Sequence, residues 1–554
     1  MKKTLFPIRI ILIGLLVAAF NQSCTNLDED LFSEVTPANF FKTEEEFISA
    51  LGSAYTQFGG WASGDPQGLQ EFTTDEMAAP TRGQDWDDGG SWRRLHLHAW
   101  TKEDGVMSGA WNFGFSGVNT ANRLIYQFQS LVTSGQVKQE VADAYVAELQ
   151  AVRGFFYWQL IDLYGNVPLV NDFITAEATP ATKTRLEVYN WLIKDLEAAV
   201  PKLSKAVDGT TYGRMNYWAG KALLAKLYLN AKVYSGTAQY DLAIAACDEI
   251  INSGKYTLES NFFKNFNTDN SGSKEFIFAI PYDKVFFQGF QIHMQSLSYL
   301  SQATYNLTAQ PWNGFCSLEE FYNSFDDTDL RKGEPGTLTS PSIKRGTFIA
   351  GYQYSSSGAI LSDDGVETSD PDGKPLNFGS IGSGKPQINE LGPQAWRQAG
   401  VRIGKFEFAS GSTEHLSNDY AVFRYADVLL MKAEAQWRKS GNATDAASLA
   451  LVNQIRARAG VANLTTLDGK LSFDLAGAVV PGGELFNELG RELAFEKSRR
   501  QAMIRWGVFT NVTKWMLPAK NVGDVWKTDA YLTLFPIHKD KLAANPNLKQ
   551  NDGY

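Results

Sequence analysis

One stretch of sequence indicates the fold class most clearly: Phe423-Arg424-Tyr425-Ala426-Asp427-Val428-Leu429-Leu430-Met431-Lys432-Ala433-Glu434-Ala435-Gln436-Trp437. Its apolar residues recur every three or four positions, the spacing that places side chains on one face of an α-helix, and they are Ala426, Leu429, Leu430, Ala433 and Trp437. A second run with this spacing follows, formed by Ala446, Ala447, Leu451, Val452 and Ile455. The two runs predict a pair of packed amphipathic helices.

An earlier part of the chain repeats this pattern. The segment from Arg214 to Val233 has apolar residues on two faces, so we expect a helix packed on two sides, and Tyr240 to Ile251 predicts its partner. Both pairs approximate the two-helix tetratricopeptide repeat of about 34 residues. Further helices are predicted over Asp143 to Tyr164, Glu187 to Leu203 and Glu484 to Ile504, the last with Glu492, Glu496 and Arg500 four apart along one side. We therefore predict a mainly α fold with a tetratricopeptide-like helical scaffold.

A long irregular region separates the two helix pairs. Residues from about Tyr256 to Tyr420 are rich in Gly, Ser, Asn and aromatic side chains, with one short strand predicted over Glu275 to Ile280. Loops of this length inside a compact protein usually carry function. We expect a single domain over residues 24–554, with the scaffold at about 106–255 and 415–554 and loop-rich ligand-binding parts at about 59–105 and 256–414.

The N-terminus predicts export. A basic start precedes an apolar run from Ile10 to Phe20, which is too short to span a bilayer and is typical of a secretory signal peptide. Cys24 stands where cleavage would occur. We therefore predict a lipoprotein signal peptide over residues 1–23 and acyl chains on Cys24; an ordinary signal peptide that ends near a free cysteine is the alternative.

The composition limits the classes of partner that the protein could bind. The formal net charge of −10 argues against nucleic acid, because phosphate binding needs a concentrated basic surface. If Cys24 is acylated, Cys247 and Cys316 remain, and we expect two buried, unpaired thiols. Aromatic residues make up 13% of the chain, with 14 Trp and 22 Tyr, which leaves rings for stacking on a ligand after the core is filled.

Several fragments mimic catalytic or metal-binding motifs, and each lacks a necessary part. The segment Gly379 to Lys385 fits Gly-x4-Gly-Lys, but Pro386 follows where a phosphate site needs Ser or Thr at the start of a helix. His96 and His98 have no third zinc ligand nearby. The acidic loops lack the spacing of an EF-hand, and they are Asp85-Trp86-Asp87-Asp88 and Asp363-Asp364 with Asp370 and Asp372. We expect no catalytic residue, metal or cofactor, although the sequence leaves open a carboxylate pair for glycoside hydrolysis.

Five ordered motifs carry a resemblance to a known family. They are Ala151-Val152-Arg153-Gly154-Phe155-Phe156-Tyr157-Trp158 with Leu163 to Val170, Phe423 to Ala435, Asn453 to Gly460, Glu492 to Glu496 with Arg499-Arg500, and Phe535-Pro536-Ile537 with Asn545 to Tyr554. With these motifs the chain resembles the SusD/RagB family of nutrient-binding lipoproteins over essentially the whole mature sequence. His538 replaces the last proline of the family's "FPIP", a minor departure.

The resemblance implies a function at the cell surface. Proteins of this kind capture an oligo- or polysaccharide, here with starch-like α-glucan as the first guess, and pass it to a TonB-dependent, SusC-like transporter in the outer membrane. The acidic residues Asp28-Glu29-Asp30 fit export of a lipoprotein to the outer face in Bacteroidetes, with a solvated linker as the alternative. A RagB-like peptide-binding lid of a transporter and a surface glycoside hydrolase are the other hypotheses, and the resemblance argues against catalysis.

The resemblance also suggests site residues. In starch-binding members an Arg, a Trp, a Tyr-x-x-Gln pair, an Asp and a further Trp form an aromatic arc. The nearest matches by order and spacing are Arg82, Trp100, Asp283, Tyr299, Gln302 and Trp312. The loop from Pro80 to Trp92 mixes rings with polar residues as a sugar site requires, so we add Trp86, for which a role as loop anchor is the alternative.

Overall fold

The computed structural model describes residues 44–82, 85–334, 346–363, 374–379, 397–398, 400–474, 477–511 and 527–554. Among the described residues, Phe47–Tyr554 form one compact unit. The predicted signal peptide, Cys24 and the acidic residues 28–30 lie outside the described residues. Within the described part of the chain, no helix is both long and apolar enough to cross a membrane.

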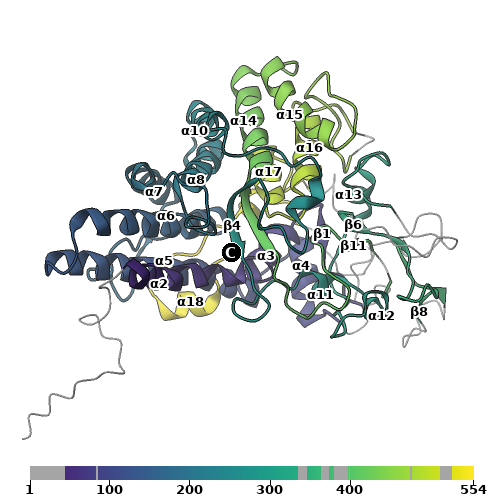
Figure 1. Cartoon of the computed structure of the whole chain (residues 1–554), viewed down its shortest axis with the longest axis horizontal. Coiled ribbons are helices and arrows are strands. Elements are labelled where there is room, and N and C mark those ends of the chain that lie inside the picture. The colour runs from purple at the N-terminus through teal and green to yellow at the C-terminus, as the bar shows by residue number, and fades with distance from the viewer. Residues whose placement is uncertain are drawn as a thin grey trace, which may run out of the picture. The chain divides into compact units, whose positions relative to one another are not determined.

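A row of packed helices makes up the scaffold (Figure 1). Each helix contacts the next, and in order they are α5 (Gly105–Thr133), α6 (Gln139–Leu163), α7 (Arg185–Ala199), α8 (Tyr217–Leu229), α10 (Tyr240–Asn252), α14 (Tyr425–Ser440) and α15 (Ala446–Arg458). The helix α10 packs directly on α14, although the whole loop-rich insertion separates them in the chain. The predicted mainly α fold, with helix pairs before and after an insertion, is confirmed.

The predicted apolar residues of α14 and α15 meet in one buried core, except Ala446 and Ala447, which lie in the first turn of α15 and are exposed. Its members include Ala426, Leu429, Leu430, Ala433, Trp437, Leu451, Val452 and Ile455. The Ser448 hydroxyl donates a hydrogen bond to the Ala433 carbonyl (3.0 Å), which joins the two helices where their side chains are small. At Gly441 the φ angle is +63°, a conformation that glycine adopts without steric cost, and α14 ends there.

The sequence analysis assigned residues from about 106 to the helical scaffold, but it did not identify the longest helix of the described residues, α5, as one element. The helix α5 contains Gly109, Gly114 and Gly117, and glycine lowers helix propensity. The structure shows why they are needed. A Cβ at Gly117 would lie 2.2 Å from the Phe156 ring, and one at Gly114 would lie 2.6 Å from Leu160, so the glycines let α5 approach α6 closely.

The prediction of one helix from Glu484 to Ile504 is wrong. Two helices, α16 (Gly483–Leu493) and α17 (Arg499–Arg505), are separated by a turn in which Phe495 and Lys497 have φ angles of +62° and +61°. Their backbone N–H groups donate to the buried carboxylates of Glu76 (2.9 Å) and Glu71 (2.6 Å). Partners distant in sequence therefore interrupt a helix that the local pattern alone would continue.

Short strands hold the insertion to the scaffold. The strand β4 (Phe276–Pro281), close to its predicted position, pairs antiparallel with β12 (Asp419–Arg424), so the two ends of the insertion lie together. The remaining pairs are β1 (Met77–Ala78) with β5 (Cys316–Ser317), β2 (Val167–Pro168) with β3 (Thr182–Lys183), β6 (Phe348–Ile349) with β11 (Arg402–Ile403), β7 (Gly351–Tyr352) with β10 (Asn377–Phe378) and β8 (Ser362–Asp363) with β9 (Lys374–Pro375).

Short helices complete the unit, and several of them lie beside the small strands at the side away from α5 to α7 (Figure 1). The α-helices are α2 (Glu44–Tyr55), α3 (Asp65–Glu71), α4 (Ser91–His96), α9 (Ala231–Ser235), α11 (Ile292–Ser296), α12 (Ser301–Tyr305), α13 (Glu319–Asn323) and α18 (Lys539–Ala544). The 3-10 helices are η1 (Thr56–Gly60), η2 (Asp88–Gly90), η3 (Val200–Lys202), η4 (Phe262–Asn265) and η5 (Ala530–Thr533).

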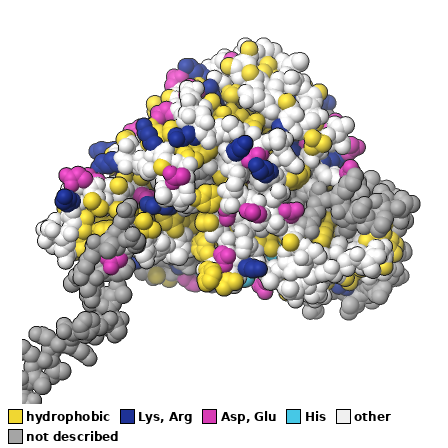
Figure 2. All heavy atoms as spheres, in the orientation of Figure 1, with side chains coloured by type: hydrophobic (Ala, Val, Ile, Leu, Met, Phe, Trp, Pro, Cys, Tyr) yellow, Lys and Arg dark blue, Asp and Glu magenta, His cyan; other side chains and the backbone are white. Residues whose placement is uncertain are grey.

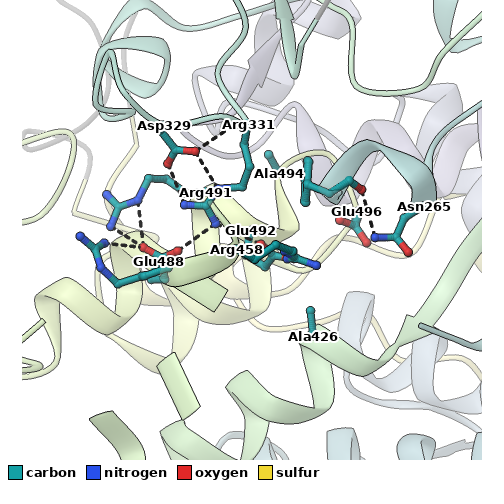
Figure 3. Close-up of polar contacts among 12 residues, drawn as sticks. Asn265, Asp329, Arg331, Ala426, Arg458, Glu488, Arg491, Glu492, Ala494 and Glu496 are labelled. Atoms are coloured by element: carbon teal, nitrogen blue, oxygen red, sulfur yellow. Dashed lines mark hydrogen bonds and ion pairs between the residues drawn. The ribbon is translucent and has the colours of Figure 1, made fainter. Parts of the chain in front are cut away.

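Acidic and basic side chains are interspersed over the face of the scaffold shown in Figure 2, but a large set of charged side chains is buried. Figure 3 shows part of this set, which joins α16 to the insertion and to α15. Glu492 is 0% exposed and forms ion pairs with Arg424 (2.6 Å), Arg331 (3.0 Å) and Arg458. Glu488, one turn earlier on α16, also pairs with Arg331 (2.8 Å). Glu496 pairs with Arg424 (2.7 Å) and Arg500 pairs with Asp162 (3.0 Å), so these two residues, four apart in the predicted helix, bind partners distant in sequence.

The buried carboxylates remain ionised because several cations surround each one. Burial alone would raise the pKa of Glu492, but Arg458, Arg424 and Arg331 hold it well below its usual range. The pKa of Glu488 is likewise lowered to about 2, against the effect of burial, chiefly by Arg331. A carboxylate whose pKa is depressed by folding stabilises the folded state above the pKa of the unfolded chain, and this stabilisation disappears as the pH falls.

Replacing Glu492 tests this cluster. The change Glu492→Gln removes one buried carboxylate shared by Arg424, Arg331 and Arg458, which leaves the buried charges unbalanced, and should lower the free energy of unfolding at pH 7 by about 3–5 kcal/mol, measured by urea denaturation. Because the Glu492 pKa is depressed, the difference from wild type should be constant above about pH 5 and shrink at lower pH. The exposed Glu140→Gln is the control. Equal stability of both variants at pH 7 would contradict the importance of the cluster.

Candidate functional site

The early loop block and the insertion meet where β1 pairs with β5. Beyond these strands, the loop after β1 faces the segment that leads into β5. The partly exposed rings of Trp86, Trp92, Tyr299 and Trp312 lie here, and we call them the aromatic cluster. This arrangement brings together three residues that the sequence analysis had proposed as site residues.

Trp86 is the centre of the aromatic cluster. Its indole N–H donates a hydrogen bond to the Trp312 carbonyl (2.8 Å), and its ring lies 5.8 Å from that of Trp92. Edge-on contact with Phe315 (6.2 Å between centroids) supports the ring from the interior. The Trp86 backbone has a φ angle of +58°, uncommon for a large side chain. The ring position is thus fixed by contacts with a segment more than 200 residues away in sequence.

The backbone of residues 312–314 is docked on α11 and the turn after it. The N–H groups of Trp312, Asn313 and Gly314 donate to the carbonyls of Met294 (2.7 Å), Leu297 (2.9 Å) and Gln295 (2.9 Å). A Cβ at Gly314 would lie 2.3 Å from the Trp86 ring, so glycine is needed for the close approach. The segment that carries Trp312 therefore has little freedom to move.

Polar groups lie beside the rings. The Tyr299 hydroxyl donates a hydrogen bond to the Asp85 carboxylate, and burial followed by this carboxylate raises the pKa of Tyr299. The Arg397 guanidinium lies over the Tyr299 ring, 5.3 Å from its centroid. Gln302 is partly exposed one turn after Tyr299, and its side-chain amide donates to the Leu307 carbonyl (3.2 Å). The cluster thus combines ring faces with carboxylate, amide and guanidinium groups.

Arg82 lies behind the aromatic cluster. Its side chain is 0% exposed and donates to the carbonyls of Gly314 (3.3 Å) and Arg397 (3.2 Å) and to the sulfur of Cys316 (3.4 Å). The expectation that Arg82 meets a ligand directly does not match this burial. Its hydrogen bonds instead hold the backbone of Gly314 and Arg397, which lies behind the rings. Cys247 and Cys316 are both buried and unpaired, as predicted.

Two other proposed site residues lie elsewhere. Trp100 is 2% exposed, donates its indole N–H to the Tyr554 hydroxyl (2.7 Å) and packs on Phe535, so its ring belongs to the core and is not presented to a ligand. Asp283 closes its own turn after β4, where its carboxylate accepts hydrogen bonds from the N–H groups of Val285 and Phe286 (both 2.8 Å). Among the described residues, none of the Asp283 hydrogen bonds reaches the aromatic cluster.

The two histidines considered as zinc ligands are part of the protein interior. His96 and His98 are fully buried, and burial lowers their pKa values to about 4 and about 3. The His98 ring lies against Phe509, with centroids 4.4 Å apart. In the described ranges, no group of three or more His, Cys, Asp or Glu side chains is placed to hold a metal ion. The side chains of Asp363, Asp364, Asp370 and Asp372 and most of Gly379 to Lys385 lie outside the described residues.

Sequence reasoning missed Asp85 and Arg397 as parts of the aromatic cluster. Asp85 lies in the Pro80–Trp92 loop predicted to suit a sugar site, but it was not named as a site residue, and its bond to Tyr299 spans 214 positions of sequence. Arg397 stands in a loop without periodicity. The aromatic content of the nearby loop was the one local signal. It indicated Trp86 and Trp92, but it could not predict which residues contact them.

Comparisons with known proteins cover nearly the whole chain. Residues 274–554 match the family model described as "SusD family", and residues 28–229 match the one described as "Starch-binding associating with outer membrane". The starch-binding protein SusD of Bacteroides thetaiotaomicron is 24% identical over 430 residues, which are 74% of this chain and 72% of that protein. A SusD-like protein of Bacteroides ovatus is 31% identical over 190 residues, 33% of this chain and 34% of that protein.

Solved structures share the fold. A SusD superfamily protein from Parabacteroides distasonis superposes with a TM-score of 0.69 at 20% identity, covering 94% of this chain and 100% of that chain. The surface glycan-binding protein A of Bacteroides thetaiotaomicron, solved in complex with laminarihexaose, gives a TM-score of 0.67 at 19% identity and covers 92% of this chain and 99% of that chain. At these identities the likeness shows a common architecture.

Changing Gly314 tests whether the aromatic cluster is as closely packed as described. The added methyl group of Gly314→Ala would lie 2.3 Å from the Trp86 ring and 2.6 Å from the Gln295 carbonyl. We expect a loss of about 1–3 kcal/mol in stability and a red shift of tryptophan emission as Trp86 is displaced. Gly209→Ala, where a Cβ meets nothing within 4 Å, is the matched control. Unchanged stability and emission in Gly314→Ala would show that the ring is not held as described.

Proposed function

Since the chain belongs to the SusD family, we propose that it is a cell-surface lipoprotein that captures an oligo- or polysaccharide and delivers it to a TonB-dependent outer-membrane transporter. The observation that carries this proposal is the aromatic cluster, in which the Trp86 indole bonds to the Trp312 backbone, Tyr299 bonds to Asp85 beside Trp86, and all three side chains are partly exposed. The names of the relatives support it: one is a starch-binding protein, and a solved structure of the same fold is a laminarin-binding SusD-like protein.

The chemistry of the aromatic cluster suits a sugar. A pyranose ring has apolar C–H faces and a rim of hydroxyl groups, so a binding site needs exposed aromatic faces with hydrogen-bonding groups beside them. Tyr299 and Trp312 supply ring surface, and Asp85, Gln302 and Arg397 supply acceptors and donors. Because the backbone under the rings is fixed by hydrogen bonds, little ordering entropy is lost when a ligand binds.

The residues of the proposed site divide into two groups by exposure. Trp86, Tyr299, Gln302 and Trp312 are partly exposed, and we propose that they contact the glycan. Arg82 is buried, and we propose that it positions the Gly314 and Arg397 backbone behind the rings. Starch-like glucan is the first candidate ligand. One relative that aligns with 74% of this chain is named as a starch-binding protein. The proposal includes no catalytic step.

Removing single rings tests the binding site. We expect Trp312→Ala and Tyr299→Ala each to weaken glycan binding by about 1–3 kcal/mol, the usual contribution of an aromatic stacking anchor, while the thermal transition changes little. Affinity gels containing starch, laminarin or other glycans would identify the ligand, and calorimetry would measure the loss. Tyr299→Phe keeps the ring but loses the bond to Asp85, which separates stacking from hydrogen bonding.

The control is Tyr126→Ala, which removes an exposed ring on α5. Unchanged affinity in both cluster variants would place the site elsewhere. Binding of a peptide mixture in place of every glycan would favour a RagB-like peptide lid. Steady release of reducing ends from the bound oligosaccharide would favour a glycoside hydrolase.

Replacing Cys24 tests the lipid anchor. We expect Cys24→Ala to give a folded protein that no longer fractionates with membranes, because acyl chains provide anchoring that the rest of the chain does not. The measurement is fractionation of cells that lack the transporter, which removes indirect attachment. Cys247→Ala, which changes a buried thiol, should stay with the membranes. A Cys24→Ala protein still bound to membranes in those cells would rule out the lipoprotein proposal.

A further inference from the structure

Two buried carboxyl groups fasten the turn between α16 and α17 to the segment that enters β1. Glu71 is 0% exposed and Glu76 is 1% exposed. The Glu71 Oε1 atom accepts a hydrogen bond from the Lys497 backbone N–H (2.6 Å), and the Glu76 Oε2 atom accepts one from the Phe495 backbone N–H (2.9 Å). The two glutamate side chains are also hydrogen-bonded to each other.

The bond between the two glutamates requires a proton. Among the described residues, Glu71 Oε2 and Glu76 Oε1 accept no hydrogen bond from an N–H group or a hydroxyl group, so they are the oxygens available to each other. An ionised carboxylate can only accept hydrogen bonds, and two carboxylates at hydrogen-bonding distance repel each other. One carboxyl group must therefore hold a proton and donate a hydrogen bond to the other.

The two nearest cations direct their donors to other groups. The Arg499 guanidinium donates two hydrogen bonds of 2.7 Å to Asp75, and its Nε atom lies 3.9 Å from Glu76, beyond hydrogen-bonding distance. The Lys497 ammonium group donates to the Tyr420 hydroxyl (2.9 Å). Neither cation therefore takes the place of a proton between the glutamates.

The local charges balance if one glutamate is protonated. Lys405, which also acts on Glu71, pairs with Glu496 (2.6 Å). With this pair and the pair of Arg499 formed, the Lys497 charge is left to balance both glutamates, so one shared proton makes the group neutral. Burial raises the pKa of Glu76 well above its usual range, and the Glu71 carboxyl raises it further.

We propose that Glu71 and Glu76 share one proton in the folded protein, and that this proton is needed to fasten the α16–α17 turn beside β1. The Glu76 carbonyl accepts a hydrogen bond from the Ser317 hydroxyl of β5 (2.7 Å), so the joint also reaches the strand that follows Trp312. When the proton is lost at higher pH, two buried charges of the same sign repel each other and loosen the joint. This inference does not depend on the proposed glycan site.

Glu76→Gln tests the shared proton, because the amide group of glutamine can donate a hydrogen bond to Glu71 at any pH. A group whose pKa is raised by folding stabilises the folded state below the pKa of the unfolded chain, and this contribution is lost as the pH rises. Wild type should therefore lose stability relative to Glu76→Gln as the pH rises. We expect the ratio of the folding equilibrium constants, variant over wild type, to increase about 3- to 10-fold for each pH unit between about pH 5 and pH 7, measured by urea denaturation.

Two further variants make the trend specific. The exposed Glu140→Gln should show no change of this ratio with pH. Glu492→Gln should show the opposite trend, confined to pH values below about 5, because the pKa of Glu492 is depressed. Burial lowers the pKa of Lys497 to about 7, and this group is present in every protein compared. A ratio for Glu76→Gln that stays constant or falls as the pH rises would overturn the inference.

Infrared spectroscopy gives a direct readout that can be made on wild type even if a variant fails to fold. The C=O stretch of a protonated carboxyl group lies at a higher frequency than the bands of a carboxylate. We expect wild type to show this band at pH 7 and Glu76→Gln to lose it. The absence of the band from wild type at pH 7, or a band that Glu76→Gln leaves unchanged, would overturn the inference.

Discussion

The buried pairing of Arg424 with Glu492 and Glu496 is the interaction on which the rest of the structure depends. Arg424 ends β12 and immediately precedes α14, and it also pairs with Glu275 (3.1 Å) at the start of β4. One guanidinium thus joins the helical scaffold, both ends of the insertion and α16. Its three carboxylate partners come from different parts of the chain, so these parts must be in place together for the buried charges to balance.

The same region sets the position of the aromatic cluster. The turn between α16 and α17 binds Glu71 and Glu76 through its backbone, and Arg499 pairs with Asp75 through two hydrogen bonds of 2.7 Å. These carboxylates lie just before β1, which pairs with β5 and so aligns the loop of Trp86 with the backbone of Trp312. The loops that carry the aromatic cluster are therefore held by charged contacts with the C-terminal helices.

The spacing of apolar residues predicted the features that depend only on neighbouring positions in the sequence. The face formed by Ala426, Leu429 and Trp437 follows from spacing alone, and the structure places it in the core. The break at Phe495 and the close packing at Gly117 depend on partners far along the chain, so spacing could not predict them. Trp86 and Trp100 show the same limit for the site. Both are tryptophans in one loop-rich block, but Trp100 is covered by Phe535 and Tyr554 from the C-terminal segment.

Charged contacts in the scaffold hold a set of rings in place, and we propose that these rings bind a glycan. The most direct measurement is a crystal structure of the protein with the oligosaccharide that affinity gels select. We expect density for sugar rings stacked on Tyr299 and Trp312, with the cluster backbone in the same positions as in the free protein. Sugar density only at other places, with these rings uncovered, would contradict it.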